Sequence, residues 1–140
     1  MKKKRIVAAI LALILIFSLC ATAFAEEIMP LANAYINSKT GSISRHGDGT
    51  IDIYFYVCAT GKMSSLGASK IELYKADGSL MKTFYSASYS NMLTSNDYAY
   101  GSSVSYSGKE GESYYAVITF YASCDDGSST ATYTTSVTKA

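Results

Sequence analysis

The sequence is poor in the residues that enzymes use for chemistry. It has no tryptophan, a single proline and a single histidine, His46, and only 16% of its residues are charged. It contains no G-x-S-x-G or S-x-x-K pattern and no glycine-rich phosphate loop. A serine hydrolase would have to build its triad on that one histidine. These absences argue against hydrolase and nucleotide-dependent activities, so we expect neither an enzyme nor a cofactor.

The balance of charge disfavours binding to a polyanion. The chain has twelve lysines and arginines against eleven aspartates and glutamates. Four of the basic residues lie at positions 2–5, in front of an apolar run that has the pattern of a removable leader. Without them the chain is mildly acidic. It then has no basic patch for nucleic acid or anionic lipid, and we expect neither as a partner.

The N-terminus has the three parts of a secretory signal peptide. The basic segment 2–5 is followed by the apolar segment 6–19 and by the small-residue site Ala23-Phe24-Ala25. The acidic residue Glu26 comes directly after that site. The pattern therefore predicts a signal peptide at 1–25, with cleavage between Ala25 and Glu26.

Two other interpretations of the N-terminus stay open. The apolar segment could remain as an uncleaved anchor, or Cys20 could carry a lipid, although a lipoprotein signal has a small residue where this chain has Leu19. No second apolar segment of spanning length follows. We expect a short extension at 26–33 and one domain at 34–140. The mature protein would be secreted, at most loosely held at the cell wall, with no transmembrane span.

The rest of the chain has the composition and alternation of a β protein. It contains thirteen tyrosines and many serines and threonines, which favour strands over helices. Short alternating runs are separated by Gly, Asp and Ser. They predict strands within 33–44 and at 50–57, 69–74, 79–85, 102–107, 113–123 and 128–138, with Asp77-Gly78 as a two-residue hairpin turn. About seven strands at this spacing indicate an all-β antiparallel sandwich.

Two predicted connections are longer than a turn. In GKMSSLGA (61–68) we expect Met63 and Leu66 to pack beneath a single helical turn. The segment SASYSNMLTSNDYAYG (86–101) is long enough to be partly irregular. Since loops carry binding residues more often than sheet faces do, the second connection is the first place to expect a site.

The stretch GESYYAVITFYAS (111–123) resembles the sixth strand of immunoglobulin-like and fibronectin type III-like domains. The resemblance covers about residues 34–138 and implies an immunoglobulin-like β-sandwich. It places a tyrosine corner on Tyr114, or on Tyr115 if the register slips, with the hydroxyl bonded back to the backbone. The sequence departs from antibody domains because the strand KIELY (70–74) has no tryptophan. Together with ATGKMSSLGASKIELYKADGS (59–79), this stretch also resembles small secreted proteins of Gram-positive bacteria, which implies a compartment and a fold but no activity.

Cys58 and Cys124 are the two cysteines left after cleavage, and an exported chain usually joins such a pair. In an immunoglobulin-like sandwich the second and sixth strands reach the same end, so a Cys58–Cys124 disulfide is predicted. A loop of this length would give the bond about 4 kcal/mol in the chain-entropy model. However, Cys58 has the opposite alternation phase from Ile51 to Val57. Two free thiols are the first alternative, and a catalytic or metal role is the second.

The polar clusters have simpler explanations than catalysis or metal binding. His46, Asp48 and Asp52 are too few for a zinc or calcium site, so we interpret SRHGDGTID as a turn that enters a strand. The carboxylate pairs Glu110/Glu112 and Asp125/Asp126 lie in predicted turns. Exposed turns do not separate the pKa values of two carboxyl groups as acid–base catalysis requires.

Tyrosine is the one residue in unusual supply, and it suits recognition because it offers contact area at low entropic cost. Most tyrosines are expected to fill half-buried sheet faces. Tyr89, Tyr98 and Tyr100 are the candidate ligand contacts because their segment is predicted to be a loop. We expect a non-catalytic recognition module for an extracellular glycan or a surface protein. The alternatives are a structural, envelope-associated protein and a small bacteriocin-like effector, and the sequence indicates no oligomeric state.

Overall fold

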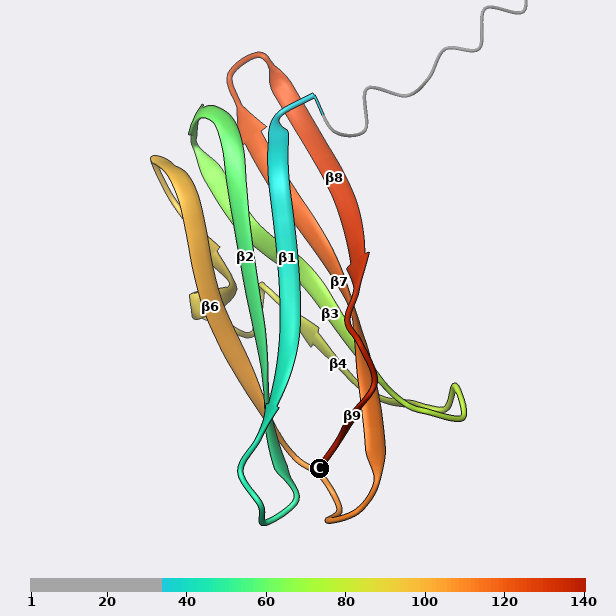
Figure 1. The fold of residues 1–140 in the computed structure, drawn as a ribbon. Helices are drawn as coiled ribbons and strands as arrows, with labels where there is room; N and C mark the ends of the chain where they lie inside the picture. The colour runs from blue at the N-terminus through green and yellow to red at the C-terminus, as the bar shows by residue number, and fades with distance from the viewer. Residues whose placement is uncertain (1–33) are drawn as a thin grey trace, which may run out of the picture. The chain divides into compact units, whose positions relative to one another are not determined.

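Two antiparallel sheets make up the part of the chain that the computed structural model describes, residues 34–140. The predicted signal peptide, its cleavage position and the extension 26–33 lie outside the described residues. Figure 1 shows β6, β2 and β1 side by side, with the second sheet packed against them. The first sheet has the order β1-β2-β6, formed by β1 (Ile36–Arg45), β2 (Thr50–Met63) and β6 (Asp97–Ser107).

The second sheet has the order β4-β3-β7-β8, with two short strands attached to it. Its main strands are β4 (Leu80–Tyr85), β3 (Ser65–Lys75), β7 (Ser113–Cys124) and β8 (Gly127–Thr134). The strand β5 (Leu93–Thr94) pairs with β3, and β9 (Thr138–Lys139) pairs with β7. The prediction of an all-β antiparallel sandwich is confirmed, with nine strands rather than seven because these two-residue strands have no alternation to reveal them.

The core lies between the two sheets and follows the predicted alternation. On β2 the residues Ile51, Ile53, Phe55 and Val57 are buried. From β7 the alternate residues Tyr114, Ala116, Ile118, Phe120 and Ala122 meet them. The rings of Phe55 and Phe120 contact edge to face with centroids 6.4 Å apart. Burial of a large side chain such as Ile53, Phe55 or Phe120 stabilises the fold by about 1.5–3 kcal/mol relative to its exposure to water.

The connection at 61–68 contains no helical turn, which corrects the prediction for this segment. β2 continues to Met63, and β3 begins at Ser65 in the other sheet. The N–H of Ser64 donates to the carbonyl oxygen of Ser123 at 2.8 Å and fixes the crossing point. Met63 and Leu66 are both buried as expected, but strand residues that change sheets bury them.

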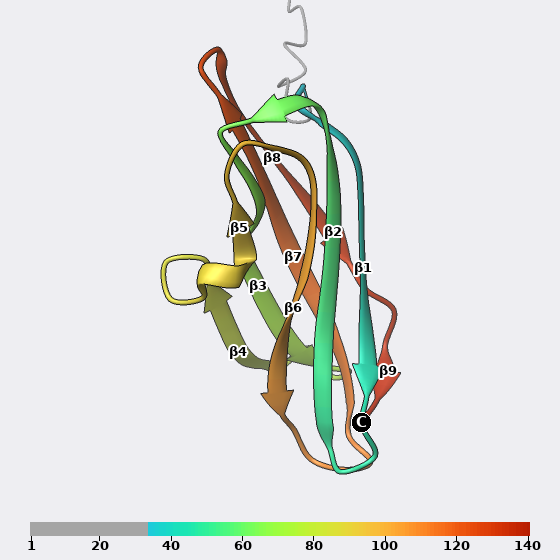
Figure 2. The ribbon, with the colours of Figure 1, turned by 90° about the vertical axis from the view of Figure 1, so that its left-hand side faces the viewer.

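The segment 86–101 is partly irregular, as predicted, and also contains short regular elements. It holds the 3-10 helix η2 (Ser90–Met92) and β5, and β6 begins at Asp97. Figure 2 shows η2 and β5 beside β3 and β4. Met92 is fully buried. A Cβ at Gly67 would clash with the carbonyl oxygen of Met92, so glycine on β3 is what allows this close approach.

Tyr114 and Tyr115, adjacent at the start of β7, have different roles. Tyr114 is buried, and its hydroxyl oxygen accepts a hydrogen bond from the N–H of Lys109 at 3.0 Å. Tyr115 instead stacks on Tyr74 of β3. The bond to Lys109 ties the β6–β7 connection to the core. No helix within 34–140 has the length and apolar character needed to cross a bilayer.

Candidate functional site on the outer face of the first sheet

The outward residues of β2 form a row of large side chains between two lines of small ones. Antiparallel pairing sets Tyr54 between Ser42 of β1 and Ser103 of β6, and Tyr56 between Thr40 and Gly101. Residues opposite each other in such a pairing point to the same side of the sheet. We call this surface the tyrosine face and define it by Thr40, Ser42, Tyr54, Tyr56, Gly101 and Ser103.

A groove of about 450 Å³ runs over the tyrosine face. Tyr54 and Tyr56 are 44% and 46% exposed, which is high for large aromatic residues on a central strand. A Cβ at position 101 would lie 3.0 Å from Cδ2 of Tyr56, so glycine there leaves room for the ring. The groove contains aromatic surface and polar backbone or hydroxyl groups but no charged side chain, being lined by Thr40, Gly41, Ser42, Tyr54, Phe55, Tyr56, Gly101, Ser102 and Ser103.

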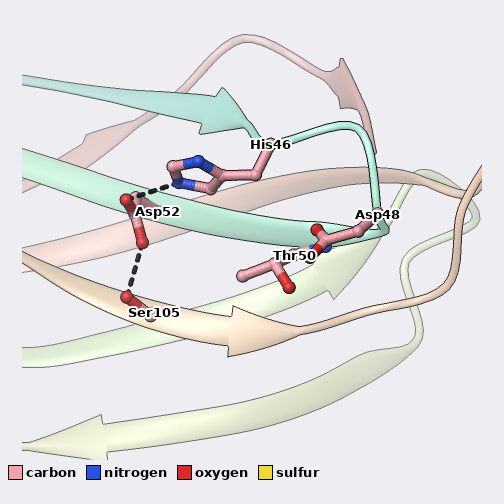
Figure 3. Close-up of polar contacts among 5 residues, drawn as sticks. All are labelled: His46, Asp48, Thr50, Asp52 and Ser105. Carbon is pink, nitrogen blue, oxygen red and sulfur yellow. Dashed lines mark hydrogen bonds and ion pairs between the residues drawn. The ribbon is translucent and has the colours of Figure 1, made fainter.

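A polar cluster continues the tyrosine face at one end. Asp52 precedes Tyr54 by two residues on β2 and is paired with Ser105 of β6. Its carboxylate accepts a hydrogen bond from the Ser105 hydroxyl, and the Nε2 atom of His46 lies 2.7 Å from its Oδ2 atom. Figure 3 shows the carboxylate between these two partners. The hydrogen bond from Ser105, followed by that from His46, lowers the pKa of Asp52 below its usual value.

The order of these contacts differs from that of a catalytic triad. In a triad the serine hydroxyl contacts the histidine, and the carboxylate orients the far side of the ring. Here Ser105 and His46 both contact Asp52, so the serine hydroxyl is bonded to the carboxylate rather than to the histidine. The cluster orients a carboxylate and does not have the order of contacts of a triad.

The neighbouring Asp48 serves the turn between β1 and β2. Its Oδ1 atom accepts the N–H of Thr50 at 2.8 Å, and this backbone hydrogen bond lowers the pKa of Asp48. Among residues 34–140 no group of three or more His, Cys, Asp or Glu side chains has an arrangement that could hold a metal ion. His46, Asp48 and Asp52 thus divide between a turn and a polar cluster on the sheet.

The three tyrosines predicted as ligand contacts make separate contacts within the fold. The ring of Tyr89 packs edge to face on Phe84, with centroids 5.2 Å apart. The hydroxyl of Tyr100 donates to the carbonyl oxygen of Asn91 at 2.9 Å. Tyr98 is 59% exposed, and it lies on β6 rather than in a loop. None of the three lines the groove of the tyrosine face.

The sequence contains one local signal for the residues that line the groove, the alternation phase of the two tyrosines. In TIDIYFYV (50–57), Tyr54 and Tyr56 occupy the phase opposite to the apolar residues, which predicts that they face outward. The small residues beside them come from β1 and β6, which lie far away in the sequence. Without the strand register, nothing in the sequence shows that these two rings have no large neighbour.

The predicted disulfide is absent, because Cys58 and Cys124 are both free thiols, each half-buried. β2 does not end at Cys58 but continues to Met63. Cys58 is therefore a mid-strand residue, paired with Ser38 and Ala99 on the outward phase of the first sheet. Cys124 is at the end of β7 in the second sheet and helps to line a separate cavity with Met63 and Asn96. The phase conflict seen in the sequence is the physical reason that the two thiols do not meet.

Comparison of the chain with protein-family models, with curated proteins and with solved structures gives no match. Support for the candidate site therefore comes from its own geometry. Its distinguishing features are two half-exposed rings on a rigid central strand, an uncharged groove and an oriented carboxylate at one end.

Proposed function

We propose that this protein is secreted and acts as a non-catalytic recognition domain that binds an extracellular glycan through the tyrosine face. The observation that carries the proposal is the pair Tyr54 and Tyr56, half exposed over an uncharged groove of about 450 Å³. A tyrosine ring offers an apolar face for the C–H side of a sugar and a hydroxyl for its polar rim. A groove of this size with a few polar groups is typical of a small-ligand site.

The strand that carries the two rings favours binding without rearrangement. β2 is the central strand of its sheet and is paired with β1 and β6 along most of its length. Its inward residues Ile53, Phe55 and Val57 alternate with the two tyrosines and are anchored in the core. A site on such a strand is already ordered before the ligand arrives, which reduces the entropy lost on binding.

We further propose that the sandwich is of the immunoglobulin-like type. Its strand orders, β1-β2-β6 and β4-β3-β7-β8, correspond to A-B-E and C′-C-F-G in that fold. The bond from Lys109 to the hydroxyl of Tyr114 at the start of β7 supports a tyrosine corner at the same place. Secretion rests on the signal-peptide pattern of residues 1–25, together with the resemblance to small secreted proteins of Gram-positive bacteria.

The test begins with the full-length gene, expressed in a bacterial host, and with protein recovered from the medium. Intact mass establishes whether the mature chain begins at Glu26. Titration against soluble cell-wall, mucin and plant polysaccharides then measures binding. We expect saturable binding to at least one of them, weakened about tenfold or more, which corresponds to about 1.4 kcal/mol, by Tyr54→Ala or Tyr56→Ala.

Tyr98→Ala is the matched control, since Tyr98 is also an exposed tyrosine of the first sheet but does not line the groove. It should leave the affinity unchanged. Loss of binding in Tyr98→Ala with full binding in Tyr54→Ala and Tyr56→Ala would place the site at the start of β6 instead. No binding to any polysaccharide would reject the glycan proposal.

A further inference from the structure

We infer that the glycan is uncharged and that Asp52 accepts a hydrogen bond from one of its hydroxyl groups at the end of the groove. This inference rests on the proposed function, because it concerns the chemistry of the ligand at the tyrosine face. It adds Asp52 as a third contact residue beside Tyr54 and Tyr56. It also predicts that the site selects against acidic polysaccharides.

The position of Asp52 brings its carboxylate to the end of the tyrosine face. It has the same outward phase on β2 as Tyr54 and lies two residues away, or about 7 Å along a strand. The side chain of Asp52 is 16% exposed, so the carboxylate is partly accessible to a ligand. A chain of sugars that stacks on the two tyrosines would extend over it.

The Asp52 carboxylate is oriented by its partners and can still accept a further hydrogen bond. Ser105 contacts its Oδ1 atom and His46 its Oδ2 atom. A carboxylate has about four acceptor sites, so two protein partners leave capacity for a ligand hydroxyl. Its depressed pKa keeps it ionised at neutral pH, and hydrogen bonds to an ionised acceptor are the stronger kind. Because Ser105 and His46 already fix the group, the ligand does not have to order it.

The charges around the groove disfavour an acidic glycan. No lysine or arginine lines the groove, so a uronate or sulfate would have no cationic partner there. It would instead approach the negative charge of Asp52. Arg45 is paired with Ile51 at the end of β1 and has the core-facing phase of Ile43, so it belongs to the other side of the sheet. His46 is already in contact with Asp52.

The experiment compares neutral with acidic polysaccharides on the same secreted protein. Mannan, galactan, β-glucan and fully methyl-esterified homogalacturonan are the neutral probes, and de-esterified polygalacturonate, alginate and hyaluronate are the acidic ones. The esterified and de-esterified galacturonans share one backbone and differ in the methyl esters that remove the charge. We expect saturable binding to a neutral probe, no binding to the acidic ones, and about tenfold weaker neutral binding in Asp52→Asn.

Asp48→Asn is the matched control, because it removes the same charge from the adjacent turn without touching the tyrosine face. It should bind as the wild type does. Binding of an acidic probe through Tyr54 and Tyr56, or an Asp52→Asn variant that binds neutral glycan at full strength, would overturn the inference and leave the proposed function standing. If no probe binds, or if binding ignores both tyrosines, the proposed function fails together with the inference.

Discussion

The outer faces of the two sheets carry tyrosine in two different settings. On the second sheet Tyr74 and Tyr115 lie opposite each other on β3 and β7 and stack, with centroids 5.2 Å and planes 11° apart. On the first sheet Tyr54 and Tyr56 lie opposite serine, threonine and glycine. A ring with an aromatic partner contributes its face to the stability of the fold. A ring between small residues keeps its face free for a ligand.

The charged residues differ between the two faces in the same way. On the second sheet Lys70 and Glu72 of β3 pair with each other, with 3.2 Å between Nζ and Oε2. On the first sheet the outward charge is Asp52, whose partners are a serine and a partly exposed histidine. The stacked tyrosines and the Lys70–Glu72 pair on the second face have partners within the fold. On the first face, Tyr54, Tyr56 and Asp52 keep ring surface and acceptor capacity for a ligand. This difference is why we assign binding to the first face.

A substitution in the core between the two sheets should have the largest effect on stability. Phe120→Ala removes a fully buried ring that contacts Phe55, and we expect it to lower the free energy of unfolding by about 3–5 kcal/mol. Urea denaturation followed by circular dichroism measures the loss. Val117→Ala on the outward phase of the same strand is the control and should cost far less. A loss below about 1 kcal/mol for Phe120→Ala would mean that the sheets do not share this core.

Removal of one tyrosine from each face should sharpen the comparison. Tyr115→Ala breaks the stack with Tyr74 and should lower the free energy of unfolding by about 0.5–1.5 kcal/mol. Tyr54→Ala removes a ring without an aromatic partner and should cost less than about 0.5 kcal/mol. Thermal denaturation of the two variants beside the wild type provides the measurement. Equal losses would show that the two settings do not differ in energy.

The hydrogen bonds of Asp52 should make stability depend on pH. Its pKa is lower in the folded chain than in the unfolded chain, so the unfolded state binds the proton first. The contribution is therefore fully present above about pH 4, the ordinary pKa of aspartate, and is lost as the pH falls through the folded value. The stability difference between wild type and Asp52→Asn should therefore shrink as the pH falls below about 4. A difference that stays constant over this range would mean that the carboxylate gains nothing from Ser105 and His46.

The smallest expected effect concerns the reactivity of the two thiols. Cys58 has the outward phase of the tyrosine face and lies two residues beyond Tyr56, while Cys124 is in the second sheet. A bound glycan should slow alkylation of Cys58 about twofold or more, by covering a half-buried thiol, and should leave Cys124 unchanged. Mass spectrometry of peptides from timed alkylation gives both rates in one sample. Equal protection of both thiols would place the ligand elsewhere.

Local sequence signals predicted the interior of the fold well. The alternation at 50–57 puts Ile51, Ile53, Phe55 and Val57 on one face, and all four are buried. The sequence left the phase of 113–123 open, and the structure buries Phe120. The Asp77-Gly78 pair marked a hairpin correctly, with Gly78 at φ 91°. The turn is longer than the predicted two residues, because Lys75 pairs with Ser79 across three intervening residues. Such signals are local, so the sequence alone carries them.

The candidate site depends on pairing between distant segments, and the sequence predicted it poorly. The length of the segment 86–101 predicts a loop at Tyr98 and Tyr100, yet β6 begins at Asp97 and pairs with β2. The groove exists because Ser42 and Ser103 flank Tyr54 in the folded chain. The alternation of Cys58 already pointed outward, and that local signal proved a better guide than the usual pairing of two cysteines in an exported chain.

The most direct test of the difference between the two outer faces is a pair of titrations with a neutral polysaccharide that the wild type binds. One uses Tyr56→Ala from the tyrosine face, and the other uses Tyr115→Ala from the second sheet. We expect Tyr56→Ala to keep its thermal stability and lose at least about tenfold in affinity, and Tyr115→Ala to lose stability and bind as the wild type does. Full affinity in Tyr56→Ala, or loss of binding in folded Tyr115→Ala, would contradict the assignment of the tyrosine face as the binding site.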